Sequence, residues 1–329
     1  MSVPLFQRLF RLTLALAGVL AFAGIEAQAG YNDLLATNLG GGNVTQYDPT
    51  TGANLGVFES TTASLPRGIA VGPDQNVYVG DLNGGIYQFN GITGSPAPSP
   101  FVAIGTINSP HGIAFGPNGD LFVSSFGGNN VLQFQGPGGA TPGALVGTFA
   151  TGSGLLGPTG LGFGGPGDNL FVASSTNNQI LEYNGTTGAF IKALATGGPL
   201  NGPAGLSFAS DGTLLVANDT GNSVLRYDVT TGALLNTITD RGLVHPSSAV
   251  YDGDGHLLVA SWSDSEILRF NLDLSTNAAS FDSVFVSGNG LDTPIYLSLV
   301  PEPGSVVLLG LGLAGVAGYA VRKRRFSRA

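Results

Sequence analysis

Short apolar stretches alternate with turns rich in Gly, Pro, Asn and Asp along most of the chain. One example has a strand-like segment at 112–115, the turn Gly-Pro-Asn-Gly at 116–119, and an apolar segment at 121–124. Gly119 supplies the positive φ angle that such a hairpin turn needs. Helical periodicity is absent between residues 31 and 300. The pattern predicts an all-β protein of many short antiparallel strands.

The strand pattern repeats at a nearly constant period. Five segments align with scarcely a gap and share an anchoring proline, followed by three further strand-like stretches separated by polar turns. The anchoring prolines are Pro66, Pro110, Pro158, Pro203 and Pro246, spaced 44, 48, 45 and 43 residues apart. A repeat of this length is typical of one four-stranded blade of a β-propeller.

The two ends of the repeat region complement each other. Residues 33–58 match strands two to four of a blade, and no first strand precedes them. Residues 293–299, which contain Pro294, match a first strand that has no successors. Pairing the two segments completes a sixth blade and removes sheet edges that invite aggregation. The sequence therefore predicts a six-bladed β-propeller over residues 30–300, closed by its N- and C-terminal strands.

The repeat motif is Pro-x-Gly-apolar-x-apolar, then Gly-Pro-Asp/Asn-Gly, then an apolar strand followed by Ser, Asn or Asp. It is similar to the NHL-repeat propellers and has some likeness to gluconolactonase-like propellers. The resemblance covers nearly all of residues 31–300 and implies the fold. It is weak for function, because one propeller scaffold hosts hydrolases, lyases and pure binders.

Both ends outside the repeats have a different character. Residues 1–29 read as a signal peptide, with basic residues, an apolar stretch at 12–24 and the small residues Ala27 and Ala29 at a cleavage site. Near the other end, residues 304–321 carry no charge and would form a helix about 27 Å long, enough for a single transmembrane span. The basic tail 322–329 should stay on the cytoplasmic side.

The C-terminal segment 301–329 also carries a family resemblance. Pro301, Glu302 and Pro303, the Gly/Leu-rich span and the terminal Arg/Lys cluster resemble the PEP-CTERM sorting signal of Gram-negative bacteria that make extracellular polysaccharide. The resemblance implies export across the inner membrane, attachment through the C-terminal helix, and processing by an exosortase near Pro-Glu-Pro. The expected location is the cell envelope, the cell surface or the extracellular matrix of a biofilm. Extracellular polysaccharide and envelope proteins are the candidate partners.

Charge and cysteine content exclude some partners and some kinds of site. Between residues 30 and 300 the chain has 19 acidic and five basic residues, a net charge of −14. Nucleic acid is therefore excluded as a partner, because its binding depends on cationic contacts to phosphate. The chain has no cysteine, so disulfides and thiolate metal sites are excluded, and the core must hold the exported protein together.

Candidate site residues follow from the repeat. The loops that lead into the innermost strands and the turns between second and third strands share one face of a propeller, so their side chains converge on the central channel. The residues directly after the anchoring prolines, here called the mouth positions, are Arg67, His111, Thr159, Ala204, Ser247 and Ile295. The candidate ligand-binding residues are Arg67, Asp81, His111, Asn218, Asp219 and Trp262.

These residues suit binding. Arg67 and His111 could together receive an anionic or sugar-like ligand, and Trp262, the single tryptophan, could stack on a sugar. Each of them also fits the plainer role of a turn residue that satisfies nearby backbone groups.

An enzyme is the alternative. A gluconolactonase-like metal site needs several convergent carboxylate or amide ligands, but the innermost positions carry no Asp or Glu. A streptogramin-lyase-like site needs a histidine with an acidic partner; His111 is available, but its partner is not identified. The sequence favours a binding or structural module without a cofactor. The alternative is a propeller hydrolase or lyase with calcium or another divalent ion in the channel.

Overall fold

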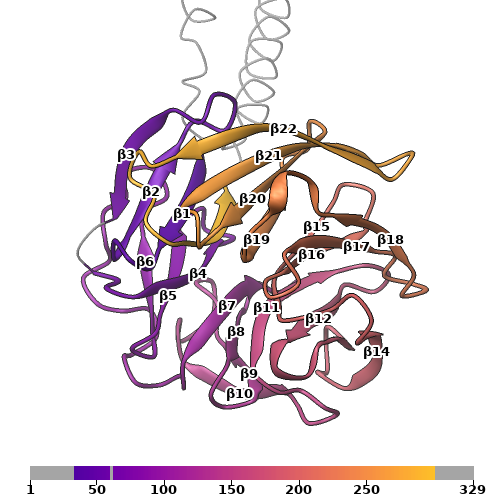
Figure 1. The fold of residues 1–329 in the computed structure, drawn as a ribbon. Coiled ribbons are helices and arrows are strands. Elements are labelled where there is room, and N and C mark those ends of the chain that lie inside the picture. The colour runs from indigo at the N-terminus through magenta and orange to yellow at the C-terminus, as the bar shows by residue number, and fades with distance from the viewer. Residues whose placement is uncertain (1–32, 60–61, 301–329) are drawn as a thin grey trace, which may run out of the picture. The chain divides into compact units, whose positions relative to one another are not determined.

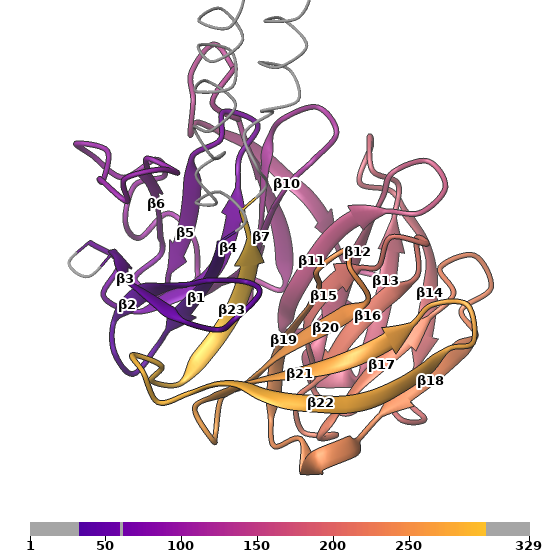
Figure 2. The same cartoon turned by 90° about the horizontal axis from the view of Figure 1, so that it is seen from above.

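The computed structural model describes residues 33–59 and 62–300, which form six β-sheets arranged around a central axis (Figures 1 and 2). The prediction of a six-bladed β-propeller is confirmed. The predicted signal peptide, with Ala27 and Ala29, and the predicted Pro-Glu-Pro segment and transmembrane helix lie outside the described residues. In the described part of the chain, no helix is long and apolar enough to cross a membrane.

The blades are numbered here from the N-terminus, and their strands follow one another outward from the axis. Blade I consists of β23 (Pro294–Leu299), β1 (Leu34–Asn38), β2 (Asn43–Tyr47) and β3 (Asn54–Glu59); blade II of β4 (Pro66–Val71), β5 (Val77–Asp81) and β6 (Gly85–Phe89); blade III of β7 (Pro110–Phe115), β8 (Leu121–Ser125), β9 (Asn130–Phe134) and β10 (Leu145–Thr151). Blade IV consists of β11 (Pro158–Gly164), β12 (Asn169–Ser174), β13 (Gln179–Tyr183) and β14 (Phe190–Thr196); blade V of β15 (Pro203–Phe208), β16 (Leu214–Asn218), β17 (Ser223–Tyr227) and β18 (Leu234–Ile238); blade VI of β19 (Pro246–Tyr251), β20 (His256–Ser261), β21 (Glu266–Asp273) and β22 (Ala278–Ser287). Two short 3-10 helices, η1 (Ser175–Asn177) and η2 (Asp240–Gly242), lie in connections.

Blade I closes the ring as the sequence predicts. The C-terminal strand β23 pairs antiparallel with β1, from Leu34 opposite Leu299 to Thr37 opposite Tyr296. The register then shifts, so that Asn38 lies opposite Pro294 and Ile295 falls in a bulge. The first and last strands of the propeller thus share one sheet.

Blade II departs from the four-stranded pattern. Its fourth position is taken by an irregular segment that touches β6 through two isolated bridges, Ile86 with Val102 and Phe89 with Pro96. This segment contains the sequence Ser-Pro-Ala-Pro-Ser-Pro at 95–100. Because proline lacks a backbone N–H, such a segment cannot form a regular ladder.

The core lies between neighbouring blades. Each of six apolar clusters joins two adjacent blades; one of them combines Tyr78 and Ile86 of blade II with Leu121 and Phe134 of blade III, all fully buried. Each sheet is therefore covered on both faces by its neighbours. Burial of both faces explains why the second strand of each blade, such as β5, β8 and β16, is buried along its length and mostly apolar.

Glycines let the innermost strands approach closely. A Cβ atom on Gly68 would lie 2.3 Å from the carbonyl oxygen of His111, and a Cβ atom on Gly160 would lie 2.3 Å from that of Ala204. Gly112 has the same relation to Thr159 at 2.5 Å. The Pro-x-Gly motif therefore sets the spacing of the inner ring and places the mouth positions next to one another.

Candidate functional site

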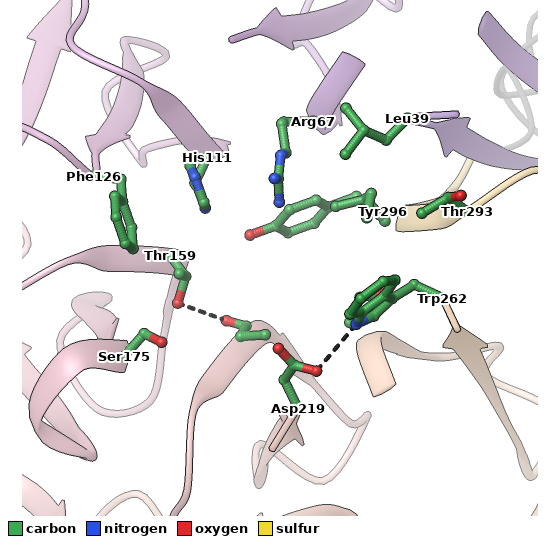
Figure 3. Close-up of a pocket in the computed structure, with 13 residues that line it drawn as sticks. Leu39, Arg67, His111, Phe126, Thr159, Ser175, Asp219, Trp262, Thr293 and Tyr296 are labelled. Atoms are coloured by element: carbon green, nitrogen blue, oxygen red, sulfur yellow. Dashed lines mark hydrogen bonds between the residues drawn. The ribbon is translucent and has the colours of Figure 1, made fainter. Parts of the chain in front are cut away.

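A cavity of about 320 Å³ lies at the mouth of the channel (Figure 3). All six mouth positions line it, and the remaining lining residues are Leu39, Phe126, Ser175, Asp219, Trp262, Thr293 and Tyr296. The side chains come from all six blades, so the cavity exists only when the ring is closed.

Of the six predicted site residues, the structure brings four together. Arg67, His111, Asp219 and Trp262 line the cavity, whereas Asp81 and Asn218 do not. The Asp81 carboxylate is fully buried and accepts hydrogen bonds from the backbone N–H groups of Leu65 (2.9 Å) and Asn83 (2.7 Å).

Asp81 and Asn218 share a structural role with four other residues. The last residue of each blade's second strand is buried and polar, and its side chain bonds to the backbone just before the anchoring proline of its own blade; these residues are Asn38, Asp81, Ser125, Ser174, Asn218 and Ser261. In Asn218, for example, the amide oxygen accepts from the N–H of Asn201 at 2.7 Å. These side chains position the loops around the cavity.

The first corner of the cavity is cationic. The guanidinium of Arg67, from β4, is half-buried, and no described residue forms a hydrogen bond or an ion pair with it. Its Nε atom is enclosed without a partner. Burial lowers the pKa of Arg67, and the nearby Tyr296 and Asp219 oppose this shift. An arginine remains protonated in proteins, so a positive charge stands in this corner.

His111 and Tyr296 lie beside Arg67 (Figure 3). Burial, and then the charge of Arg67, lower the pKa of His111 to about 3, so its imidazole is neutral at physiological pH. Its ring stacks on Phe126, with the centroids 4.6 Å apart and the planes 15° from parallel. Burial raises the pKa of Tyr296, so the phenol keeps its proton. Within the described part of the chain, neither the imidazole nor the phenol hydroxyl has a hydrogen-bond partner.

The opposite corner is acidic and aromatic. One oxygen of Asp219, Oδ1, accepts hydrogen bonds from Trp262 Nε1 at 3.1 Å and faces His245 Nδ1 at 2.8 Å. The backbone N–H of Trp262 donates to the carbonyl of His245, and the two rings lie 5.2 Å apart. These contacts fix the orientation of the indole. Figure 3 shows Trp262 and Asp219 across the cavity from His111 and Phe126.

The candidate site residues omit Leu39, Phe126, Ser175, Thr293 and Tyr296, which line the cavity, and His245, which contacts Asp219. His245 pairs with Asp219, and a signal for it was its position next to an anchoring proline. Tyr296 projects into the cavity from β23. In the sequence, Tyr296 stands out because it is the second residue after Pro294. The other five blades have a small residue at this position; these residues are Gly68, Gly112, Gly160, Gly205 and Ser248.

The enzyme alternative expects a divalent metal ion held by side chains in the channel. Within residues 33–59 and 62–300, no three His, Asp or Glu side chains gather in a group that could hold a metal ion. The three described histidines are also dispersed: His111 and His245 lie at different sides of the mouth, and His256 pairs with Asp252 in the β19–β20 hairpin.

Comparison with known proteins identifies the sorting signal. Residues 299–325 match the family described as the PEP-CTERM protein-sorting motif. The chain therefore carries a signal for export to the cell envelope or surface of Gram-negative bacteria, and the motif implies recognition by an exosortase-type processing system. A sequence search of the curated proteins finds no match.

Solved structures share the fold at low sequence identity. A chain of the nidogen/laminin complex is 17% identical with a TM-score of 0.67, and the match covers 82% of this chain and 98% of that one. A catalytically inactive variant of virginiamycin B lyase from Staphylococcus aureus, solved with quinupristin, is 15% identical with a TM-score of 0.59, covering 83% and 93%. The periplasmic gluconolactonase PpgL of Pseudomonas aeruginosa is 19% identical with a TM-score of 0.57, covering 82% and 99%. At such identities the likeness shows the propeller fold alone.

Proposed function

We propose that this exported propeller is a binding module of the cell surface or extracellular matrix, and that its channel-mouth cavity receives an anionic group of an extracellular polysaccharide. The observation that carries the proposal is the Arg67 guanidinium, which no described residue pairs with. A partly desolvated cation without a partner is unfavourable, and an anionic ligand would relieve this cost. The planar fork of arginine suits carboxylate, sulfate and phosphate groups.

The surrounding charge supports a local site. The segment 30–300 carries a net charge of −14, so an anion is repelled over most of the propeller surface. The described cations other than Arg67 have contacts of their own: Lys192 with Glu182, Arg226 with Asp211, Arg269 with Asp282, and Arg241 over the ring of Phe281. Among the described cations, Arg67 is the one whose guanidinium has no ion pair, hydrogen bond or ring contact.

The test measures retention on the host's polysaccharide. The purified protein is co-sedimented with that polysaccharide, and Arg67→Met is compared with Arg269→Met as the matched control. Arg67→Met should weaken retention at least tenfold because the charge in the cavity is lost, whereas Arg269→Met should leave it unchanged. Equal retention by both variants would overturn the proposal.

The second part of the proposal concerns how the protein is exported and processed. A signal peptide, residues 1–29, is removed after Ala29, and the helix 304–321 holds the chain in the membrane until an exosortase acts near Pro301, Glu302 and Pro303. The propeller, an NHL-like domain at residues 30–300, is then released or attached outside the inner membrane. Mass spectrometry of envelope protein from an exosortase-positive host should find a start near Gly30 and no residues 322–329. An intact basic tail would contradict this course.

A propeller hydrolase or lyase is the second candidate. The contact between His245 and Asp219 favours it, because it provides a histidine with an acidic partner at the rim of the cavity. The similar structures include a lyase and a gluconolactonase. Turnover of a lactone or a streptogramin that is lost in His245→Gln, together with a stoichiometric divalent ion such as calcium in metal analysis, would establish the enzyme in place of the binding module.

A further inference from the structure

The two corners of the cavity differ in charge, and together they restrict the ligand more than Arg67 does alone. The first corner presents the donors of Arg67, a neutral His111 and the hydroxyl of Tyr296. A carboxylate has two oxygens that accept several hydrogen bonds, so it can use the Arg67 fork and a neighbouring donor at once.

The opposite corner disfavours a second negative charge. Asp219 lies close enough for its charge to influence the pKa of Arg67. Its Oδ1 is occupied by Trp262 and His245, whereas no described residue bonds to its Oδ2. The side chain is 33% exposed, so Oδ2 is available as an acceptor. A ligand that spans the cavity must therefore be anionic at one end and present hydroxyl donors at the other.

Trp262 adds a flat apolar surface next to these acceptors. The indole is half-buried, and its N–H is tied to Asp219, which holds the ring in place. Amphipathic aromatic side chains of this kind bind groups that are apolar on one side and polar on the other. A sugar ring has this character, with C–H groups on its faces and hydroxyls at its edge.

The size of the cavity limits the number of sugar units. Its volume of about 320 Å³ is at the small end of the range of ligand pockets, roughly 300 to 1,000 Å³. One hexose-sized ring with its carboxylate therefore occupies it, and linked units must lie outside the mouth. This geometry favours the end of a chain over its middle.

We infer that the cavity recognises a single hexuronic acid residue at the end of a polysaccharide chain, with its carboxylate at Arg67, His111 and Tyr296, its ring against Trp262 and a hydroxyl donating to Asp219. This inference rests on the proposed function, because it specifies the anion that Arg67 binds. It adds the sugar ring, the hydroxyl contact and the end-on mode.

The protein contains one tryptophan, so its intrinsic tryptophan fluorescence reports on Trp262 directly. The full-length protein is titrated with sodium glucuronate, glucose and sodium acetate, which present the acidic sugar, the neutral ring and the carboxylate alone. Glucuronate should change the fluorescence and bind at least tenfold more tightly than either of the others. Galacturonate and mannuronate, titrated in the same way, show which ring stereochemistry the cavity prefers.

Variants assign each contact by calorimetry. Arg67→Met should abolish the preference for glucuronate over glucose, and Trp262→Ala should abolish the preference for glucuronate over acetate. Asp219→Asn should weaken glucuronate binding, because a neutral amide is a weaker acceptor for the sugar hydroxyl than a carboxylate. It should strengthen acetate binding, because the negative charge across the cavity is lost. Arg269→Met is the control and should bind like the wild type. Di- and trisaccharides of the uronic acid should bind within about threefold of the monosaccharide, because added units lie outside.

The outcomes separate this inference from the proposed function. If acetate or sulfate binds through Arg67 as tightly as every uronate, the cavity is a simple anion site; the sugar inference is then wrong and the proposed function stands. If affinity instead rises steeply with chain length, end-on recognition is wrong. If no anion binds and Arg67→Met changes nothing, both the inference and the proposed function fail.

Discussion

Two arginines on strands of this propeller have opposite surroundings. Arg226 on β17 is 1% exposed, and its guanidinium contacts the Asp211 carboxylate, Thr213 Oγ1 at 2.8 Å and Asn277 Oδ1 at 2.7 Å. Arg67 on β4 is half-buried and has no such partner among the described residues. Arg226 is therefore fully paired within the protein, whereas Arg67 is the arginine for which we propose an external ligand.

The difference follows from where each side chain lies. Arg226 connects blade V with the β21–β22 turn of blade VI, through Asn277 and the carbonyl of Leu274. It therefore contributes to the contact between two blades. Arg67 points into the cavity at the channel mouth, where its neighbours are a neutral imidazole and a phenol. Stability should depend on Arg226 and ligand binding on Arg67, and four measurements examine this division.

The largest expected effect is at Arg226. Arg226→Met removes a buried guanidinium that bonds to Asn277 and to the partly exposed Asp211, and the loss of these charged hydrogen bonds should lower the free energy of unfolding by about 3 kcal/mol. Urea unfolding followed by circular dichroism measures it. Arg269→Met, which removes a more exposed pair with Asp282, should cost less than about 1 kcal/mol. Similar losses of unfolding free energy in the two variants would contradict a larger structural role for Arg226.

The second-largest expected effect concerns the backbone beneath the cavity. In Gly68→Ala the new methyl group would lie 2.3 Å from the carbonyl oxygen of His111, and such overpacking costs about 2 to 3 kcal/mol. The same denaturant titration applies. Gly138→Ala is the control, because its Cβ would meet nothing within 4 Å and the change should be close to neutral. A neutral Gly68→Ala would mean that the inner ring can widen freely.

Removal of Arg67 should act in the opposite direction from removal of Arg226. Arg67→Met replaces an unpaired, partly desolvated cation with an apolar side chain, so the free energy of unfolding should stay the same or rise by about 1 kcal/mol. Thermal unfolding of variant and wild type, without ligand, measures the difference. A loss as large as that of Arg226→Met would show that Arg67 has a structural partner.

The last expected effect is a dependence of stability on pH. Because the pKa of His111 falls from 6.5 to about 3 on folding, the unfolded chain binds an extra proton between these values, and stability should decline as pH falls from about 6.5 toward 3. One proton contributes at most about 1.4 kcal/mol per pH unit. His111→Gln should make this decline shallower in thermal unfolding, and Arg67→Met should do so partly, because it removes the second cause. Identical slopes in wild type and His111→Gln would contradict the buried, neutral imidazole.

The sequence predicts which side chains face the channel mouth where the repeat alone positions them, while their binding of a ligand stays a prediction. The residue after each anchoring proline faces the cavity in all six blades, as expected from the shared position of these prolines. The turns between second and third strands were ambiguous. In blade V, Asn218 turns back to the loop at Asn201, whereas the next residue, Asp219, reaches the cavity. Sequence spacing does not distinguish these adjacent polar residues, because local hydrogen bonds decide which of them points inward.

The sequence by itself determined the number of blades, the closure of the ring by residues 293–299, the positions that face the channel and the sorting motif at 299–325. These features follow from local patterns: strand periodicity, turn glycines and a repeat length that one blade fills. Only the tertiary structure decided that Arg226 is paired, that Arg67 has no partner among the described residues, and that Tyr296 enters the cavity. The partners of Arg226 come from two hairpins, one of them in a neighbouring blade, and Tyr296 is placed by a bulge in the closing strand. Such contacts depend on distances between blades, which no local pattern in the chain encodes.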